Sequence, residues 1–328
     1  MKVPAGPRGS LPAWDGPPVL AAGHVRPLLA AREAGADAAE TSFDLGLSRV
    51  RVPLLAGGVR LPRRVRPVGA PAAPGRDDPI VPWAALEAVA AATTAGGGWR
   101  CYTVAGASDG DGEDEDQGAA GGLREIQVFS PETNRRYSLL ATPGAPTMLV
   151  SGVQMHRTAG QDPWSDTLAK VRCAAPVVGE VLDTCTGLGY TAIVAVATAS
   201  AVVTVELDPA AVEVARQNPW SRALFDQPRI ERRLGDSAEL VETFGDGRFS
   251  RVIHDPPAFG LAGDLYSGAF YRQLHRVLGR GGRLFHYVGN VASGSGQRVT
   301  RGVTQRLREA GFARVVPRPE AFGLLAFK

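Results

Sequence analysis

The chain has 328 residues, of which 44% are hydrophobic and 21% charged, and its formal net charge is +3. This length exceeds that of one ordinary domain and predicts two folding units with sizeable cores. The longest apolar run, at 192–205, contains Thr and Ser and is shorter than the roughly 20 residues that a membrane-spanning helix needs, which argues against a membrane protein.

Residues 1–18 contain one Lys, several prolines and no apolar core, so they do not predict a secretory signal. Cys101, Cys173 and Cys185 are far apart and lack the paired spacing of a zinc site or a disulfide framework. We therefore expect a cytoplasmic protein that uses no metal ion.

The small net charge hides a local asymmetry. Six acids lie in the run 109–116, and the rest of the chain carries 36 basic and 27 acidic residues. Arginines dominate the basic residues, since Lys2, Lys170 and Lys328 are the only lysines. The composition of a GC-rich genome explains this bias without any function. A basic surface also favours polyanions, so both interpretations stay open.

The first part of the chain predicts a tail and a small β-rich domain. Residues 1–38 are rich in Pro, Gly and Ala without hydrophobic periodicity, which predicts a disordered tail. Residues 39–155 predict the β-rich domain. Its segment 42–62 alternates around Gly57-Gly58 as a hairpin does, a short helix is expected within 77–98, and turn residues separate short strands between 99 and 152. The acidic stretch 106–122 predicts a disordered loop inside this domain.

Residues 156–328 alternate predicted strands and helices, which indicates a mostly parallel sheet covered on both faces. The expected strands are 180–184, 202–207, 229–234, 251–255, 282–288, 313–317 and 323–327. The last two are joined by a short turn and predict a hairpin that adds an antiparallel strand. The predicted fold class is therefore α/β, with a Rossmann-like sheet and a smaller β-rich N-terminal domain.

A glycine loop follows the first of these strands. Gly187, Gly189 and Ala192 have the spacing of a dinucleotide-binding loop, and Glu206 lies near the end of the next strand, where a carboxylate receives ribose hydroxyls. This pattern alone suits both NAD and S-adenosylmethionine, because both carry such a ribose.

Asp183 and Thr184 separate these two ligands. A pyrophosphate needs bare amides, so a carboxylate at the strand end repels it. S-adenosylmethionine carries an ammonium and a sulfonium, and Asp183 is placed to orient the loop and meet that positive charge. The sequence therefore favours a cationic nucleoside.

Asp236 and Ser237 follow the third strand, where a carboxylate accepts from an adenine amino group. The order Asp183, Glu206, Asp236 and then Asp255 resembles the class I S-adenosylmethionine-dependent methyltransferases over residues 160–328. The resemblance implies S-adenosyl-L-methionine as cofactor. The expected cofactor-binding residues are Asp183, Thr184, Cys185, Gly187, Gly189, Glu206, Asp236 and Ser237. Cys185 departs from the family pattern, which often has its first glycine there.

The fourth strand ends in Asp255-Pro256-Pro257, with an aromatic residue at Phe259. An amine that donates to Asp255 and to the Pro256 carbonyl keeps its lone pair directed at the methyl group, so alignment and desolvation supply the rate gain. This resembles the Asp-Pro-Pro-aromatic motif of amino methyltransferases, where the aromatic ring stacks on the target. Here Ala258 moves Phe259 one place later. The expected catalytic residues are Asp255, Pro256 and Phe259.

Residues 262–289 resemble the corresponding stretch of spermidine synthases, in which the acid after the fourth strand deprotonates a polyamine nitrogen. Asp264 is the nearest additional acid for a polyamine. The overall resemblance is to a group of predicted archaeal methyltransferases related to spermidine synthases, and it extends back to about Thr41.

Further candidates are weaker. His254 is expected to be a packing residue, whereas His286, Tyr287 and Asn290 are candidates for a substrate wall. His156 and Arg157 precede the second domain and are either active-site residues or linker. The arginines of the first hairpin either track phosphates or form a solvated face; they are Arg49, Arg51, Arg60, Arg63, Arg64 and Arg66.

Together these features predict methyl transfer from S-adenosyl-L-methionine to a substrate nitrogen. An RNA base is the favoured acceptor, and a small-molecule amine or a protein is the alternative. A spermidine-synthase-like aminopropyltransferase, a nicotinamide-dependent dehydrogenase and a non-catalytic nucleotide-binding fold are the rival predictions.

Overall fold

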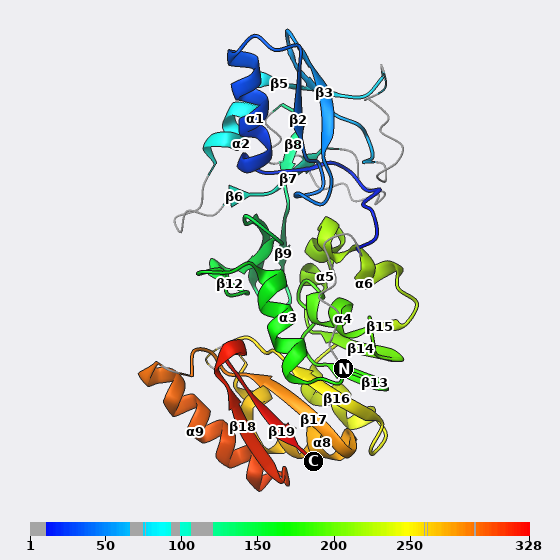
Figure 1. Cartoon of the computed structure of the whole chain (residues 1–328), viewed down its shortest axis with the longest axis vertical. Helices are drawn as coiled ribbons and strands as arrows, with labels where there is room; N and C mark the ends of the chain where they lie inside the picture. Colours follow the sequence, from blue (N-terminus) through cyan, green and yellow to red (C-terminus); the bar gives the residue numbers. More distant parts are fainter. Residues whose placement is uncertain are drawn as a thin grey trace. The chain divides into compact units, whose positions relative to one another are not determined.

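The computed structural model describes residues 11–65, 75, 77–92, 99–105, 121–258, 260, 262–291 and 293–328. These residues form two compact units (Figure 1). One unit comprises the described chain up to Pro163 together with Glu213–Ala223, and the other comprises Trp164–Val212 and Leu224–Lys328. The boundary lies slightly after the predicted one at 155–156. The predicted acidic loop lies almost wholly outside the described residues, which resume at Gly121.

The first unit is built from short antiparallel strands and the helices α1 and α2. Its elements are β1 (Val19–Leu20), α1 (Ala22–Glu33), β2 (Ala38–Thr41), β3 (Val50–Leu55), β4 (Gly58–Arg60), β5 (Ile80–Pro82), α2 (Trp83–Ala91), β6 (Trp99–Arg100), β7 (Tyr102–Val104), β8 (Leu123–Glu125), β9 (Gln127–Ser130), β10 (Arg135–Ala141), β11 (Thr147–Val150) and β12 (Val153–Gln154). The described strands pair in the orders β1-β7-β8, β2-β3-β4-β5 and β12-β11-β10-β6, and β9 also pairs with β10.

The predicted hairpin around Gly57-Gly58 is confirmed, and the structure contains a second one. β3 and β4 pair with Leu55 opposite Gly58, which leaves a two-residue turn between them. β9 and β10 pair around the turn at 131–134, where Asn134 adopts a left-handed conformation with φ 52°. The helix expected within 77–98 is also confirmed, as α2.

The prediction of a disordered tail is wrong for residues 19–33. They form β1 and α1, and α1 buries Val25 and Leu28 in the core of the first unit. The pattern was hard to read because Ala and Gly contribute little apolar contrast and Pro27 lies inside the helix.

The segment Glu213–Ala223 belongs to the first unit although it lies within the sequence of the second, which the sequence did not predict. Side chains of this segment explain the association. Trp220 is buried and its Nε1 donates to the Leu45 carbonyl at 3.1 Å, while Arg222 forms an ion pair with Asp15.

The second unit contains the predicted α/β alternation. Its elements, including those that reach into Glu213–Ala223, are α3 (Pro163–Cys173), β13 (Glu180–Asp183), α4 (Tyr190–Ala195), β14 (Ala201–Glu206), α5 (Pro209–Arg216), η2 (Pro219–Ser221), α6 (Arg222–Asp226), β15 (Ile230–Leu234), α7 (Ser237–Leu240), η3 (Val241–Thr243), β16 (Phe249–His254), η4 (Gly263–Tyr266), α8 (Gly268–Val277), β17 (Leu278–Tyr287), α9 (Gly294–Glu309), β18 (Arg314–Arg318), η5 (Pro319–Ala321) and β19 (Gly323–Phe327).

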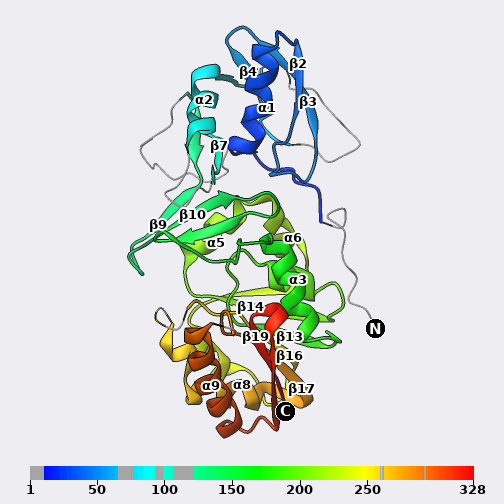
Figure 2. The same ribbon diagram turned by 60° about the vertical axis from the view of Figure 1, so that its left-hand side comes forward.

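The strands of this unit form one sheet in the order β15-β14-β13-β16-β17-β19-β18. The first five are parallel, and β19 runs antiparallel between β17 and β18. The predicted Rossmann-like sheet with an antiparallel terminal strand is therefore confirmed. Helices α8 and α9 bury Leu274 and Leu307 with Leu284 and Leu324 on one face, and Figure 2 shows these helices together at one side of the sheet. Helix α3 lies on the opposite face.

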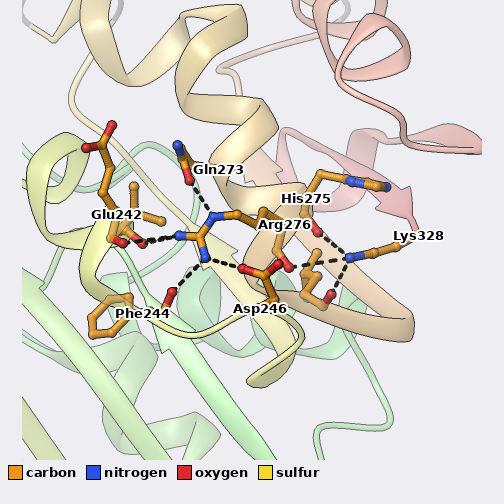
Figure 3. A network of polar contacts seen from close by, with 9 residues as sticks. Glu242, Phe244, Asp246, Gln273, His275, Arg276 and Lys328 are labelled. Carbon is orange, nitrogen blue, oxygen red and sulfur yellow. Dashed lines mark hydrogen bonds and ion pairs between the residues drawn. The ribbon is translucent and has the colours of Figure 1, made fainter.

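A polar network fastens the amino-terminal edge of the sheet (Figure 3). Arg276, at the end of α8, donates to Asp246 at 2.6 Å and to the Phe244 and Val241 carbonyls at 2.7 and 2.9 Å. Lys328 donates to the His275 and Leu278 carbonyls. These groups anchor α8 and the chain end at the edge away from the carboxyl ends of the parallel strands.

Among the described residues, every helix is too short or too polar to cross a membrane.

Candidate active site

Four acids predicted from the sequence follow four neighbouring strands. Asp236, Glu206, Asp183 and Asp255 stand at or just after the carboxyl ends of β15, β14, β13 and β16. Because the carboxyl ends of parallel strands meet at one edge of the sheet, this order places the acids along one edge. The sequence prediction that they share one site is therefore compatible with the sheet order.

The glycine loop between β13 and α4 requires both of its glycines. Gly187 and Gly189 have φ of 51° and 75°, values that favour glycine. At Gly189 a Cβ would also lie 2.6 Å from the Leu224 side chain. The Gly187 amide donates to Glu206 at 2.8 Å, so the loop is tied to the end of β14.

Asp183 is completely buried, and its carboxylate is held by two hydroxyls. Thr191 donates to Oδ1 at 3.0 Å and Thr204 donates to Oδ2 at 2.8 Å. Burial raises the pKa of Asp183 to about 8, although the two hydroxyls act in the opposite direction. The side chain therefore connects β13, β14 and α4, and its predicted role towards a cofactor stays a prediction.

Glu206 accepts hydrogen bonds from the backbone. Besides the Gly187 amide, the Asp208 amide donates to it at 3.2 Å. Burial raises the pKa of Glu206, and these amides oppose the rise. The carboxylate is thus fixed at the end of β14, the position that the sequence assigns to ribose binding.

Asp236 and Ser237 have structural contacts in addition to their predicted role. Asp236 is the N-cap of α7 and accepts from the Ala238 amide at 2.7 Å. Ser237 Oγ donates to the Thr184 carbonyl at 2.5 Å. The loop after β15 is therefore joined to the glycine loop, which brings the third and first strand ends together.

Thr184 and Cys185 lie inside this loop. The Thr184 amide donates to the Ile253 carbonyl at 3.0 Å, and its hydroxyl lies 2.6 Å from His254 Nδ1. Burial raises the pKa of Cys185 well above its usual value, so the side chain is a neutral thiol.

His254 is a packing residue, as predicted. It is completely buried, and its Nε2 lies 3.0 Å from the Leu265 carbonyl. Burial lowers the pKa of His254 to about 3, so the ring is neutral. With Nε2 donating to Leu265, Nδ1 accepts from the Thr184 hydroxyl.

Asp255 forms an ion pair that the sequence analysis missed. Lys170 on α3 donates to Asp255 Oδ2 at 2.6 Å, and its Nζ lies 2.9 Å from Asp166 Oδ2 and 4.3 Å from the centre of the Tyr287 ring. Lys170 and Asp166 are 3% and 0% exposed, whereas the Asp255 side chain is 19% exposed. Two carboxylates and an aromatic face therefore surround one ammonium, and of the two carboxylates Asp255 is the one that is partly exposed.

The charges of this cluster are coupled. Burial alone would lower the pKa of Lys170, but the Asp255 and Asp166 carboxylates raise it above its usual value. Burial raises the pKa of Asp255, and the Lys170 ammonium opposes this rise. A signal for Lys170 exists in the sequence: it is one of three lysines in an arginine-rich chain, and it follows Asp166 by one helical turn.

The remaining residues of the fourth-strand motif are only partly described. Pro256 is buried, and the Pro257 carbonyl accepts from the Tyr266 hydroxyl at 3.0 Å. This bond fixes the turn that follows Asp255. Phe259 lies outside the described residues, so its predicted stacking role stays a prediction.

The predicted substrate wall is partly wrong. His286 is completely buried, and its Nε2 lies 2.8 Å from the Tyr271 hydroxyl, so it belongs to the packing against α8. Tyr287, the next residue of the strand, points to the opposite face and lies against Lys170. Asn290 is exposed beyond the end of β17.

His156, Arg157 and the described arginines of the first hairpin all belong to the first unit. His156 Nδ1 lies 3.0 Å from the Thr147 hydroxyl, which ties it to β11. Arg157 is partly buried, and Arg60 donates to the Asp78 carbonyl. The exposed arginines of the first hairpin are Arg49, Arg51, Arg63 and Arg64, and Arg66 lies outside the described residues.

Within the part of the chain that the structure describes, no group of three or more His, Cys, Asp or Glu side chains is arranged to hold a metal ion.

No family model matches the chain. The uncharacterized protein MJ1233 of Methanocaldococcus jannaschii is 43% identical over 217 residues, which are 65% of this chain and 75% of that protein.

Two enzymes show shorter similarity. A polyamine aminopropyltransferase of Aeropyrum pernix is 36% identical over 85 residues, 24% of this chain and 27% of that enzyme. Putrescine N-methyltransferase 4 of Nicotiana tabacum is 27% identical over 140 residues, 41% of this chain and 36% of that enzyme. Each match therefore spans well under two thirds of the enzyme's own length.

The fold also has a solved counterpart. A spermidine synthase in complex with the transition state analogue AdoDATO superposes with a TM-score of 0.52 at 18% identity, covering 64% of this chain and 76% of that chain. The chain therefore belongs to the family of the uncharacterized protein MJ1233, and it has the Rossmann-like fold that class I methyltransferases share with spermidine synthases.

Proposed function

We propose that the protein transfers a methyl group from S-adenosylmethionine to the nitrogen of a small amine. The observation that carries this proposal is the Asp255 carboxylate, which is partly exposed at the end of β16 and held in place by Lys170. It lies in the strand order next to Asp183 and the glycine loop, where a cationic cofactor is expected.

The residues present fit such a cofactor. Gly187 and Gly189 leave the backbone of the loop without side chains, and Glu206 and Asp236 provide carboxylates at the next two strand ends. In this proposal Glu206 receives the ribose hydroxyls, Asp236 the adenine amino group, and Thr184, Cys185 and Ser237 complete the wall. When bound, the cofactor supplies an electrophilic methyl group on a sulfonium.

On the acceptor side, Asp255 accepts a hydrogen bond from the amine and Pro256 contributes its carbonyl. Tyr287 packs against the Lys170 ammonium and so helps to hold Lys170 beside Asp255. Because a methyl acceptor must present a free lone pair, the amine reacts in its neutral form, and Asp255 directs the lone pair by fixing an N–H.

Nitrogen is a better acceptor than carbon at this site. Carbon methylation of a pyrimidine through a cysteine nucleophile needs a thiolate, and burial raises the pKa of Cys185 well above its usual value. The proposal therefore uses no covalent intermediate on the protein.

A small amine replaces RNA as the favoured acceptor. The similar enzymes are named as a polyamine aminopropyltransferase and a putrescine N-methyltransferase, and both names specify an aliphatic amine. The partly exposed carboxylate of Asp255 supports the same chemistry.

Aminopropyl transfer is the second candidate, because the fold is that of a spermidine synthase. The two reactions use the same electrophilic sulfonium and differ in which of its substituents moves. Asp183 does not separate them, because both cofactors carry an ammonium and a sulfonium. Methyl transfer is preferred because the turn Asp255-Pro256-Pro257 resembles the motif of amino methyltransferases and departs from the pattern of spermidine synthases.

The test combines two cofactors with a panel of acceptors. The purified protein is incubated with S-adenosylmethionine or its decarboxylated form and with putrescine, spermidine or RNA, and products are identified by mass spectrometry. We expect an amine heavier by one methylene with S-adenosylmethionine. An aminopropyl product would establish the second candidate, and a methylated RNA without a methylated amine would contradict the proposed acceptor.

A further inference from the structure

A cavity lies in the second unit, apart from the four acids. Its volume is about 640 Å³, within the range of small-molecule sites. Its lining includes Arg172, Cys173, Arg283, Arg314, Arg318 and Phe327, together with Glu320. We call it the arginine cavity. It shares α3 with the candidate active site, but Lys170 and Asp255 are not among its lining residues.

The sheet register explains why the arginines gather. Arg283 on β17 and Arg314 on β18 both pair with Phe327 on the strand between them, so the three side chains form one row on one face. The guanidinium carbons of Arg283 and Arg314 lie 5.5 and 4.0 Å from the centre of the Phe327 ring. The aromatic ring therefore separates two guanidinium groups that face the same cavity.

The cavity has an excess of positive charge. Its lining contains four guanidinium groups and one carboxylate, Glu320, which accepts from the Cys173 thiol at 3.7 Å. A further guanidinium, that of Arg251, is buried nearby. Burial lowers the pKa of Arg251, and the positive charge of Arg283 lowers it further. Like charges that line one cavity repel one another, and a bound anion reduces this repulsion.

Guanidinium groups are suited to one class of anion. Their planar donors match the oxygen atoms of a phosphate in pairs. Arg314 and Arg318 are the first and last residues of the edge strand β18. Because side chains alternate along a strand with a period of two residues, both point to the same face of the sheet.

From this arrangement we propose that the arginine cavity binds a ligand that carries two or more phosphate groups. The proposal is independent of the proposed function, because it rests on none of the residues assigned to methyl transfer. Free polyphosphate compounds and the phosphodiester backbone of RNA both offer this chemistry, and the experiment separates them.

The probes are inorganic tripolyphosphate and a short single-stranded RNA, each titrated calorimetrically into the full-length protein at constant ionic strength. The test variant is Arg314→Gln with Arg318→Gln. The matched control is Arg298→Gln with Arg301→Gln, which removes the same number of charges from exposed positions of α9. Arg283 is kept, because it donates to the Ala175 carbonyl and supports the sheet.

We expect tripolyphosphate to bind the natural protein and the control with similar affinity, and to bind the test variant at least about tenfold more weakly. RNA binding with the same dependence on Arg314 and Arg318 identifies a phosphodiester source, whereas binding of tripolyphosphate alone identifies a free one. Thermal unfolding of each unliganded variant shows whether it is folded. The proposal is overturned if neither probe binds, or if the test variant and the control lose affinity equally.

Discussion

Lys170 and Asp255 are 85 positions apart in the sequence, and their side chains meet at 2.6 Å. The contact makes Asp255 a carboxylate with a fixed orientation, because Lys170 is itself held by Asp166 and by the Tyr287 ring. The desolvation of a buried ion pair offsets most of its Coulombic attraction, so the pair adds little to the free energy of folding. It does fix the orientation of the Asp255 carboxylate. In the proposed reaction that geometry points one acceptor oxygen towards the substrate amine.

Replacing Lys170 tests this role through pH. In Lys170→Met the nearby cation is lost, so the pKa of Asp255 rises, and the pH at which activity falls on the acidic side moves upward by about one pH unit or more. Lys170→Arg keeps the charge and is expected to restore most of the profile. The measurement is kcat/KM against pH. An unchanged acidic limb in Lys170→Met would show that Lys170 does not act on Asp255.

Replacing Asp255 separates binding from transfer. Asp255→Asn keeps the shape but removes the negative charge, and we expect the transfer rate to fall by about a hundredfold because the amine loses its alignment. Cofactor affinity should stay within about twofold, since Asp255 is assigned to the acceptor. Glu309→Gln, on α9, is the control for loss of one acid. Equal loss of rate and cofactor affinity would make Asp255 a residue of the scaffold.

Asp183 predicts a proton release on cofactor binding. Its pKa is about 8 in the unliganded protein, so at pH 7 the carboxyl group is mostly protonated. A cationic cofactor favours the ionised form, so affinity should rise with pH up to about 8 and then level off. Calorimetry in two buffers of different ionisation enthalpy measures the released proton. A flat affinity profile, identical in Asp183→Asn, would contradict this coupling.

A side chain at position 189 is expected to clash with Leu224. Gly189→Ala places a Cβ in the left-handed region and within 2.6 Å of Leu224, and we expect it to lower the free energy of unfolding by about 2 to 4 kcal/mol. In the background Leu224→Ala the same change should cost less, because the steric part is removed. Denaturant unfolding of the four proteins gives the coupling, and strictly additive effects would exclude the contact.

The sequence predicts the part of the site that depends on local patterns. The positions of Asp183, Glu206 and Asp236 at strand ends could be predicted because each follows a recognisable strand, and the sheet order then places them along one edge. Lys170 was not found because its partner Asp255 is far away in the sequence and only the three-dimensional fold brings α3 over β16. His286 was wrongly expected in the substrate wall. Neighbouring residues of a strand point to opposite faces, so an error of one residue in the expected register exchanges His286 with Tyr287.

The same limit applies to the fold. The α/β alternation and the terminal hairpin of β18 and β19 were predicted from periodicity and turn residues. Helix α1 was not predicted because its Ala and Gly residues contribute little apolar contrast and Pro27 lies inside it. The membership of Glu213–Ala223 in the first unit depends on Trp220 and Leu45, a contact between distant segments that no local pattern reports.

The most direct test of the central claim measures which nucleoside the strand ends bind. S-adenosylmethionine, its decarboxylated form and NAD are titrated into the natural protein and into Glu206→Gln. The account predicts that S-adenosylmethionine binds the natural protein and binds Glu206→Gln at least about tenfold more weakly, because the ribose loses its carboxylate. Binding of NAD alone, or of S-adenosylmethionine with equal affinity to both proteins, would contradict it.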